Sequence, residues 1–270
     1  MTNNHPVTLD IVGLLPAGGQ ATRISPLPVS KELYPIGFHA VGTNSTLRPK
    51  VVCHYLLEKM RLAGIHKAFV VLRPGKWDIP TYLGDGTMLD MRLGYLTVHV
   101  PYGIPYTLDQ AYPFIQTSLV ALGFPDILFD PEDAFVHLVN HQAATQAEVV
   151  LGLFPTEQYQ KAGMVEVSPT GQVHKIIEKP ASTNLKYMWA IALWTPTFTQ
   201  FLHHYLATIP PEHWQQPGQR ELPIGDVIQA GIDAGLRVEA EIFDRGMYLD
   251  IGTPNDLIRA VHQFTPVIES

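Results

Sequence analysis

The feature that most constrains the fold of this chain is an alternation of apolar runs of strand length with amphipathic runs of helix length. Residues 11–15 form the first apolar run, apolar positions recur at helical spacing over 51–63 before Gly64, and 68–72 is again strand-like. This alternation is typical of βαβ units, whose strands are parallel and whose helices cover the sheet. We therefore expect an α/β fold with a Rossmann-like, doubly wound, mostly parallel sheet.

The rest of the chain extends this pattern. The residue patterns predict strands at 96–100, 119–124 and 149–154, and helices at 108–117, after 131–133, at 223–234 and at 255–261. Two shorter runs, 163–167 and 173–177, flank a Pro-Thr-Gly turn and predict paired strands. We expect this pair to belong to a small β-rich lobe packed over the sheet. The proline-rich stretch 210–218 is predicted to be a loop.

Composition excludes several classes of protein. The chain has 270 residues, of which 46% are hydrophobic, which is enough for a large buried core and excludes a disordered or fibrous protein. The formal charge of -7 argues against a surface that grips nucleic acid. No apolar run reaches about 18 residues, and residues 1–6 lack a signal-peptide pattern. We expect a cytoplasmic protein that binds no membrane.

Cysteine and histidine indicate little chemistry. The single cysteine, Cys53, lies in an apolar helical pattern and is interpreted as a packing residue. The twelve histidines show no convincing zinc-ligand spacing, so we expect them to be solvated or structural.

The first strand leads directly into Ala17, Gly18 and Gly19. Glycine allows backbone N–H groups to approach an anion closely, so a glycine pair after a strand suits phosphate binding. Arg23 and Lys31 follow closely and supply two cations for triphosphate oxygens. The alternative is two ordinary surface cations beside a turn.

Residues 15–27 (LPAGGQATRISPL) and 29–36 (VSKELYPI) are similar to the glycine-rich signature and the lysine segment of sugar-1-phosphate nucleotidyltransferases. The resemblance includes glucose-1-phosphate thymidylyltransferases and bacterial UTP:glucose-1-phosphate uridylyltransferases. It continues in the family's order through 62–65, 83–86, 178–180, 220–226 and 248–253. It implies a single domain over 1–270, with a nucleotide-binding part at about 8–155 and a sugar-binding part at about 156–270. Members are often oligomeric, and the resemblance suggests a homo-oligomer here.

The resemblance also implies a reaction and its residues. A sugar-phosphate oxygen attacks the α-phosphorus of a nucleoside triphosphate, with dTTP or UTP favoured as donor and glucose 1-phosphate as the default acceptor, and pyrophosphate leaves. Charge on oxygen must then be neutralised. Matching positions give Arg23, Lys31, Asp126, Lys179 and Asp250 as catalytic; Ala17, Gly18, Gly19 and Thr107 as nucleotide-binding; Glu178 and Lys179 as sugar-binding; and Asp126 and Asp250 as ligands of Mg²⁺.

The chain departs from the family pattern at several positions. Ala21 and Thr107 stand where the family has glycine facing the nucleotide, and Ala192 replaces a glycine of the sugar-contacting strand. Residues 37–50 contain extra length, which is either a lid or a tolerated surface insertion.

Two other functions compete with the enzyme. A non-catalytic homologue would bind a nucleotide or sugar nucleotide and regulate or scaffold a partner, which the departures at Ala21 and Thr107 favour. A dinucleotide-dependent oxidoreductase would need G-x-G-x-x-G, which the residues after Gly18 do not provide. The complete charged set favours the enzyme.

Overall fold

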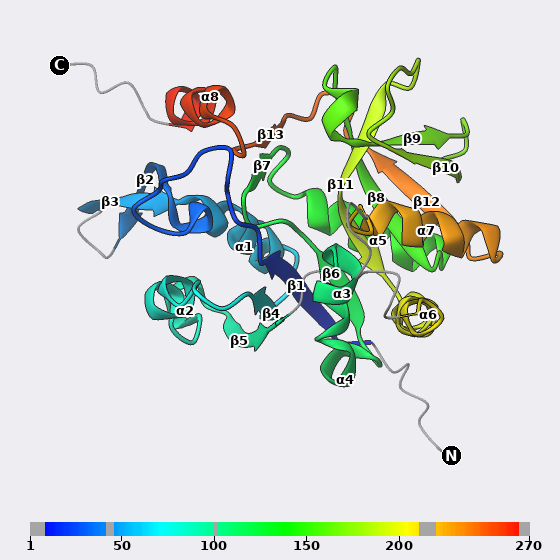
Figure 1. Ribbon diagram of the computed structural model, residues 1–270, viewed down its shortest axis with the longest axis horizontal. Coiled ribbons are helices and arrows are strands. Elements are labelled where there is room, and N and C mark those ends of the chain that lie inside the picture. Colours follow the sequence, from blue (N-terminus) through cyan, green and yellow to red (C-terminus); the bar gives the residue numbers. More distant parts are fainter. Residues whose placement is uncertain (1–8, 42–45, 100–101, 211–219, 265–270) are drawn as a thin grey trace.

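The computed structural model describes residues 9–41, 46–99, 102–210 and 220–264, and a nine-stranded sheet forms its centre (Figure 1). Seven strands follow the order β10-β9-β11-β6-β1-β4-β5, and β8 pairs with both β11 and β12. The strands are β1 (Ile11–Ala17), β4 (Lys67–Leu72), β5 (Arg92–Thr97), β6 (Leu119–Leu122), β8 (Val149–Pro155), β9 (Gly163–Val167), β10 (Val173–Glu178), β11 (Tyr187–Trp194) and β12 (Val238–Ile242).

The first βαβ unit is confirmed. Strand β1 pairs in parallel with β4 on one side and with β6 on the other, and helix α1 (Val52–Leu62) precedes β4. Gly64 ends this helix at a φ of +77°, and the Ile65 N–H donates to the Met60 carbonyl at 3.1 Å. This is the left-handed helix end for which glycine is suited.

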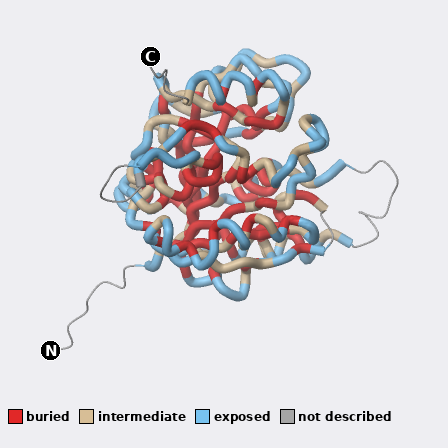
Figure 2. Tube along the Cα trace, turned by 90° about the vertical axis from the view of Figure 1, so that its left-hand side faces the viewer, coloured by how far each residue is buried: buried red, intermediate tan, exposed pale blue. Residues whose placement is uncertain are grey.

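Helices cover both faces of the sheet. They are α1, α2 (Asp78–Leu83), α3 (Ile104–Asp109), α4 (Tyr112–Ile115), α5 (Ala134–Thr145), α6 (Pro196–Ala207), α7 (Ile224–Asp233) and α8 (Pro254–Phe264), with 3-10 turns η1 (Lys31–Leu33), η2 (Thr87–Leu89) and η3 (Tyr159–Lys161). Leu15 packs in one core with α1, α2 and α5, whereas its neighbour Leu14 packs in the other with α3, α4, α6 and α7. Successive strand residues point to opposite faces, so one strand serves two cores. Figure 2 shows the buried residues at the centre of the molecule.

The extents of two predicted elements differ from the structure. The strand predicted at 96–100 is β5, which begins at Arg92 because Arg92 pairs with Lys67 of β4, and Val100 lies outside the described residues. The helix predicted at 108–117 is two short helices, α3 and α4. Pro113 has no N–H for the carbonyl four residues earlier and its ring clashes there, so a continuous helix is broken before it.

The hairpin predicted at 163–177 is confirmed as β9 and β10, but its position is not as expected. It continues the main sheet at one edge, where Met164 pairs with Met188 of β11, instead of packing over a face. The open edge of β11 explains this, because its backbone groups need hydrogen-bond partners. Most of the loop predicted at 210–218 lies outside the described residues.

The extra residues after Ile36 form a separate hairpin of β2 (Pro35–Val41) and β3 (Thr46–Val51), whose tip at 42–45 lies outside the described residues. The Tyr55 hydroxyl donates to the Ile36 carbonyl at 2.7 Å and fastens the hairpin to α1. A third core, which includes Ile36 and Ala260, joins it to α8 and to the two-stranded ribbon of β7 (Ile127–Phe129) and β13 (Tyr248–Asp250). No described helix has the length and apolar character needed to cross a membrane.

Candidate active site

The predicted phosphate loop lies at the carboxyl edge of the sheet, between β1 and β6. Gly18 and Gly19 follow β1, and Asp126 follows β6, its parallel neighbour. The chain leaves β1 for β4 on one side and reaches β6 on the other, so the two strands flank a topological switch point. Doubly wound sheets bind ligands in this crevice.

Three charged side chains meet there. Lys31 forms an ion pair with Asp126, and both side chains are largely buried. Strand β13 brings the third: Asp250 pairs with Ile127, and the Ile251 N–H donates to the Asp126 carbonyl at 3.3 Å. Figure 1 shows β7 and β13 side by side beyond the end of β1. Asp250 on β13 therefore lies close to Asp126, which directly precedes β7, although the two are 124 positions apart in sequence.

The electrostatics of this group favour a bound cation. Burial, and then the neighbouring Asp126 carboxylate, raise the pKa of Asp250 although Lys31 opposes the shift. Burial lowers the pKa of Lys31, but Asp126, Asp250 and Glu32 together raise it above its usual value. Lys31 is therefore a cation at neutral pH, and the two carboxylates compete for its positive charge.

A cavity of about 530 Å³ opens beside this group. Gly18, Gly19, Lys31, Thr107 and Asp126 line it. A Cβ placed on Gly18 would meet no protein atom within 4 Å, so the loop backbone faces open space. Ala17 is only 1% exposed and supports the loop from the end of β1. The cavity therefore lies at the predicted phosphate loop and has a cationic side chain, Lys31, in its lining.

Thr107 forms part of the cavity wall, but its hydrogen-bonding groups turn inward. Its N–H and its hydroxyl both donate at 3.3 Å to the carbonyl of Gly103, the residue that precedes α3. A β-branched side chain in a helix is stiff. Thr107 therefore shapes the cavity and offers it no free backbone donor.

A second cavity, of about 300 Å³, adjoins the first and shares Ile104, Phe124 and Glu221 with it. Glu178 and Lys179, the predicted sugar-binding pair, line the second cavity. Burial, and then Asp226, raise the pKa of Glu178. A partly buried carboxyl group in a small cavity is suited to accept hydrogen bonds from hydroxyl groups.

Arg23 does not line the cavities beside the glycine loop. Its guanidinium is 3.9 Å from the Asp250 carboxylate, and it lines a hollow of about 270 Å³ with Lys161 and Arg259. The structure thus places Lys31 and Asp126 in the cavity of Gly18, Gly19 and Thr107, and Glu178 and Lys179 in the adjoining cavity. Asp250 lies near Lys31 and Asp126 but lines the 270 Å³ hollow together with Arg23.

Sequence reasoning missed three charged residues of these cavities, namely Arg73, Lys76 and Glu32. Arg73 lines the 530 Å³ cavity and also a neighbouring one of about 500 Å³, which Lys31 and Lys76 line as well. Lys76 donates to both carboxylate oxygens of buried Glu32, at 2.6 and 2.7 Å. Arg73 directly follows β4, so its place after a predicted parallel strand was a usable signal.

Ala192, predicted to lie on the sugar-contacting strand, does not line the second cavity. It is fully buried, because β11 pairs it with Leu122 of β6 and with Leu151 of β8. Met188, Trp189 and Ala190 of the same strand line the cavity instead. An irregularity in the β11 to β8 register between Trp189 and Ile191 makes this assignment difficult from sequence.

Ala21 adopts a left-handed backbone with a φ of +53°, at the position where the resembled signature has glycine. An L-residue pays about 1–2 kcal/mol for this conformation. We expect Ala21→Gly to stabilise the protein by about 1 kcal/mol, raising the melting temperature by roughly 2–4 °C. Ala143→Gly, on the exposed face of α5, is the matched control and should destabilise by a similar amount. If thermal unfolding showed that both variants lower the melting temperature equally, the backbone of Ala21 would not be strained.

Comparison with known proteins agrees with this geometry. Residues 12–266 match the nucleotidyl transferase family. The low-salt glycan biosynthesis nucleotidyltransferase Agl11 of Haloferax volcanii is 24% identical over 253 residues, covering 92% of this chain and 64% of the relative. A glucose-1-phosphate thymidylyltransferase of Streptomyces griseus is 27% identical over 250 residues, covering 91% and 63%. The chain thus spans just under two thirds of either relative's length.

A solved structure of a UDP-glucose pyrophosphorylase with UDP-glucose has a TM-score of 0.76 to this chain. The two are 17% identical, and the match covers 95% of this chain and 98% of the other. This likeness confirms the predicted Rossmann-like fold.

Proposed function

Since this chain belongs to the nucleotidyl transferase family, we propose that it transfers a nucleotidyl group from a nucleoside triphosphate to a sugar 1-phosphate. The products are a nucleoside-diphosphate sugar and pyrophosphate. The observation that carries the proposal is the meeting of Lys31, Asp126 and Asp250 beside two adjoining cavities. One cavity suits the triphosphate and the other suits the sugar.

The reaction needs charge neutralisation and positioning more than covalent chemistry. A phosphate oxygen of the acceptor bonds to the α-phosphorus, while the bond from that phosphorus to the oxygen bridging to the β-phosphorus breaks. Lys31 remains charged at neutral pH and lines the glycine cavity, so it can hold phosphate oxygens as negative charge develops. Arg73 supplies a second cation on the same wall, and Lys179 a cation for the phosphate of the acceptor.

Magnesium is the proposed cofactor, held by Asp126 and Asp250. Their donor set fits, because Mg²⁺ usually takes one or two protein carboxylates together with substrate phosphates. Burial, and then repulsion by Asp126, raise the pKa of Asp250, and a divalent cation between the two carboxylates would offset that repulsion. When bound, the ion would neutralise phosphate charge. The Asp126 carboxylate would then contact both the Lys31 ammonium group and the magnesium ion.

The sugar cavity offers a test of its own at Gly225, on the first turn of α7. A Cβ there would lie 1.9 Å from the Glu178 Oε1 atom, so Gly225→Ala must displace that carboxylate. Because a hydrogen bond to a charged group is worth about 1.5–3 kcal/mol, we expect the KM for the sugar phosphate to rise about 10- to 100-fold. The KM for the triphosphate should not change.

Gly231→Ala is the matched control on the same helix, where the added Cβ would approach the end of the Leu236 side chain at 3.2 Å. Steady-state kinetics with each substrate varied in turn gives both constants. An unchanged sugar-phosphate KM in Gly225→Ala would remove Glu178 from the sugar site.

The donor and acceptor are proposed from the thymidylyltransferase relatives and from the motifs shared with uridylyltransferases: dTTP or UTP, with glucose 1-phosphate. The test is a panel of the common triphosphates against several sugar phosphates, with Mg²⁺ and detection of pyrophosphate. We expect release that depends on both substrates and produces the matching nucleotide sugar. No release with any pair would contradict the proposal.

The same panel distinguishes the second candidate, a homologue that binds nucleotides without turnover, which the inward-turned donors of Thr107 favour. A protein of that kind would release no pyrophosphate, yet a triphosphate would still raise its melting temperature, because a ligand that binds only the folded state stabilises it.

A further inference from the structure

His54 is an unexplained polar residue in the interior. Its side chain is 0% exposed, and neither ring nitrogen has a hydrogen-bond partner among the described residues. Buried polar atoms almost always have a hydrogen-bond partner. Two ring nitrogens without one therefore indicate that an ion or a water molecule binds there. His54 lies on α1, on the side that faces the β2–β3 hairpin.

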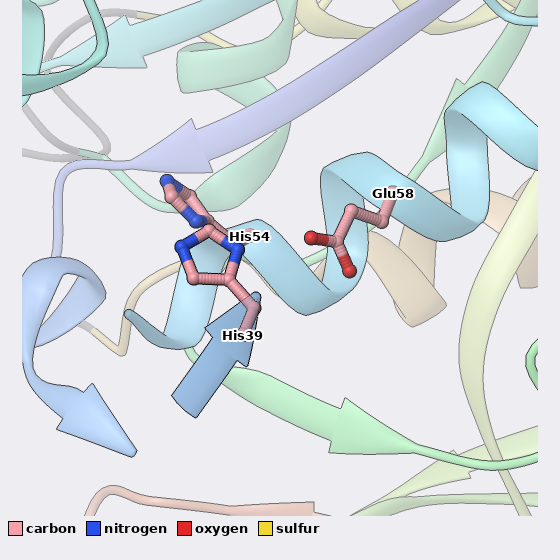
Figure 3. A group of neighbouring side chains, drawn as sticks. All are labelled: His39, His54 and Glu58. Carbon is pink, nitrogen blue, oxygen red and sulfur yellow. The ribbon is translucent and has the colours of Figure 1, made fainter. Parts of the chain in front are cut away.

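Two further ligand-type side chains face it. His39 comes from β2, and Glu58 lies one helical turn after His54, on the same face of α1. Taking one ligand atom from each residue, all three atoms lie within 4.8 Å of one another. Figure 3 shows the two imidazole rings close together, with the Glu58 carboxylate directed towards them.

We propose that His39, His54 and Glu58 bind a divalent transition-metal ion of the zinc class. Two imidazole nitrogens and one carboxylate oxygen are ligands that zinc accepts, whereas magnesium prefers oxygen ligands only. Three protein ligands leave a fourth position for water. His39 and Glu58 are partly exposed, so an ion can reach the buried histidine.

The state of His54 agrees with this assignment. Burial, with help from His39 and Lys50, lowers its pKa to about 4. The ring is therefore neutral at physiological pH, and a neutral imidazole has a lone pair for a metal. One of its two orphan nitrogens would become a ligand.

Lys50 competes with the metal. Its ammonium forms an ion pair with Glu58 and also lies 4.0 Å from the centre of the Tyr55 ring. An incoming ion would have to share the Glu58 carboxylate with this cation and withstand its repulsion. Removing the charge of Lys50 should therefore tighten metal binding.

The site is separate from the proposed catalytic centre. None of its three ligands lines any of the cavities that surround Lys31 and Asp126. It joins the hairpin to α1, which in turn packs against the turn η1 that carries Lys31. The expected role is to brace the hairpin on the body of the protein.

The test uses the full chain without a histidine tag, treated with a chelator and titrated with Zn²⁺ by calorimetry. The background variant is Asp126→Asn with Asp250→Asn, so that the carboxylates of the cleft cannot contribute. We expect one Zn²⁺ per chain. At a Zn²⁺ concentration of about 100 times Kd the melting temperature should rise by roughly 5–10 °C. Co²⁺ should give visible absorption bands typical of nitrogen ligation.

Variants identify the ligands. His39→Ala and Glu58→Gln should each weaken Zn²⁺ binding more than about 100-fold, because even outer partners of metal ligands cost 10- to 100-fold. Lys50→Met should strengthen it. His174→Ala, an exposed histidine on β10, is the matched control and should have no effect. His54→Phe is a third variant, but it changes a fully buried residue and the protein could fail to fold. His39 and Glu58 are only partly buried, so their variants test the site independently of His54→Phe.

No Zn²⁺ binding in the background variant would overturn the proposal and leave a water molecule as the partner of His54. So would an affinity that is the same in His39→Ala and Glu58→Gln as in the unmodified site.

Discussion

Replacing Asp126 by asparagine is expected to reduce the maximal rate of pyrophosphate release on the order of 10³-fold, the largest effect of any single substitution. The change keeps the shape of the side chain but removes a negative charge from the centre where Lys31 and Asp250 meet. An amide is a poor ligand for Mg²⁺, and metal stabilisation of a transferring phosphoryl group is worth several kcal/mol. The Mg²⁺ concentration that gives half the maximal rate should rise as well.

Asp133→Asn is the control for this variant. Asp133 precedes α5, and its side chain is 52% exposed outside the cleft, so its removal should leave the rate unchanged. Both variants are compared in the pyrophosphate assay over a range of Mg²⁺ concentrations. Wild-type activity in Asp126→Asn at low Mg²⁺ would exclude this carboxylate as a ligand.

The second large effect is expected for Lys31→Met, with a fall in kcat of about 10²- to 10³-fold. That is the range seen when one preorganised group that stabilises developing negative charge is removed. The two substitutions should differ in their metal dependence. Lys31 is paired with Asp126, so it would compete with the proposed Mg²⁺, and Lys31→Met should leave the Mg²⁺ requirement unchanged or lower it.

Lys67→Met is the control for the lysine, because Lys67 pairs with Asp10 at the surface and is 54% exposed. Steady-state rates over a range of Mg²⁺ concentrations provide both quantities. If Lys31→Met kept its kcat and instead needed more Mg²⁺, Lys31 would support the metal site and would not stabilise the transferred group.

The sequence was sufficient for the parts of this fold that depend on local pattern. Strand β1 followed by Gly18, and α1 ended by Gly64, were predictable because apolar spacing and glycine act over a few residues. Asp126 was placed correctly after a central strand for the same reason. Its meeting with Asp250 followed from the family resemblance, since nothing local links β7 to β13.

The errors arose where partners distant in sequence decide the structure. The start of β5 is set by pairing with β4, and the position of the β9–β10 hairpin by the open edge of β11. His39 and His54 come together only because the hairpin folds back on α1, so the sequence shows the spacing of His54 and Glu58 but not the third ligand. The omission of Arg73 has a different origin, because its position directly after a predicted parallel strand was visible in the sequence.

We propose that Asp126 and Asp250 share one metal ion beside the nucleotide. This proposal is tested most directly by a crystal structure of the chain with Mn²⁺ and a non-hydrolysable triphosphate, in which manganese is located by its anomalous scattering. We predict a manganese peak bound by both carboxylates, with the triphosphate beside Gly18 and Gly19. A triphosphate bound there with neither carboxylate contacting manganese would contradict the account.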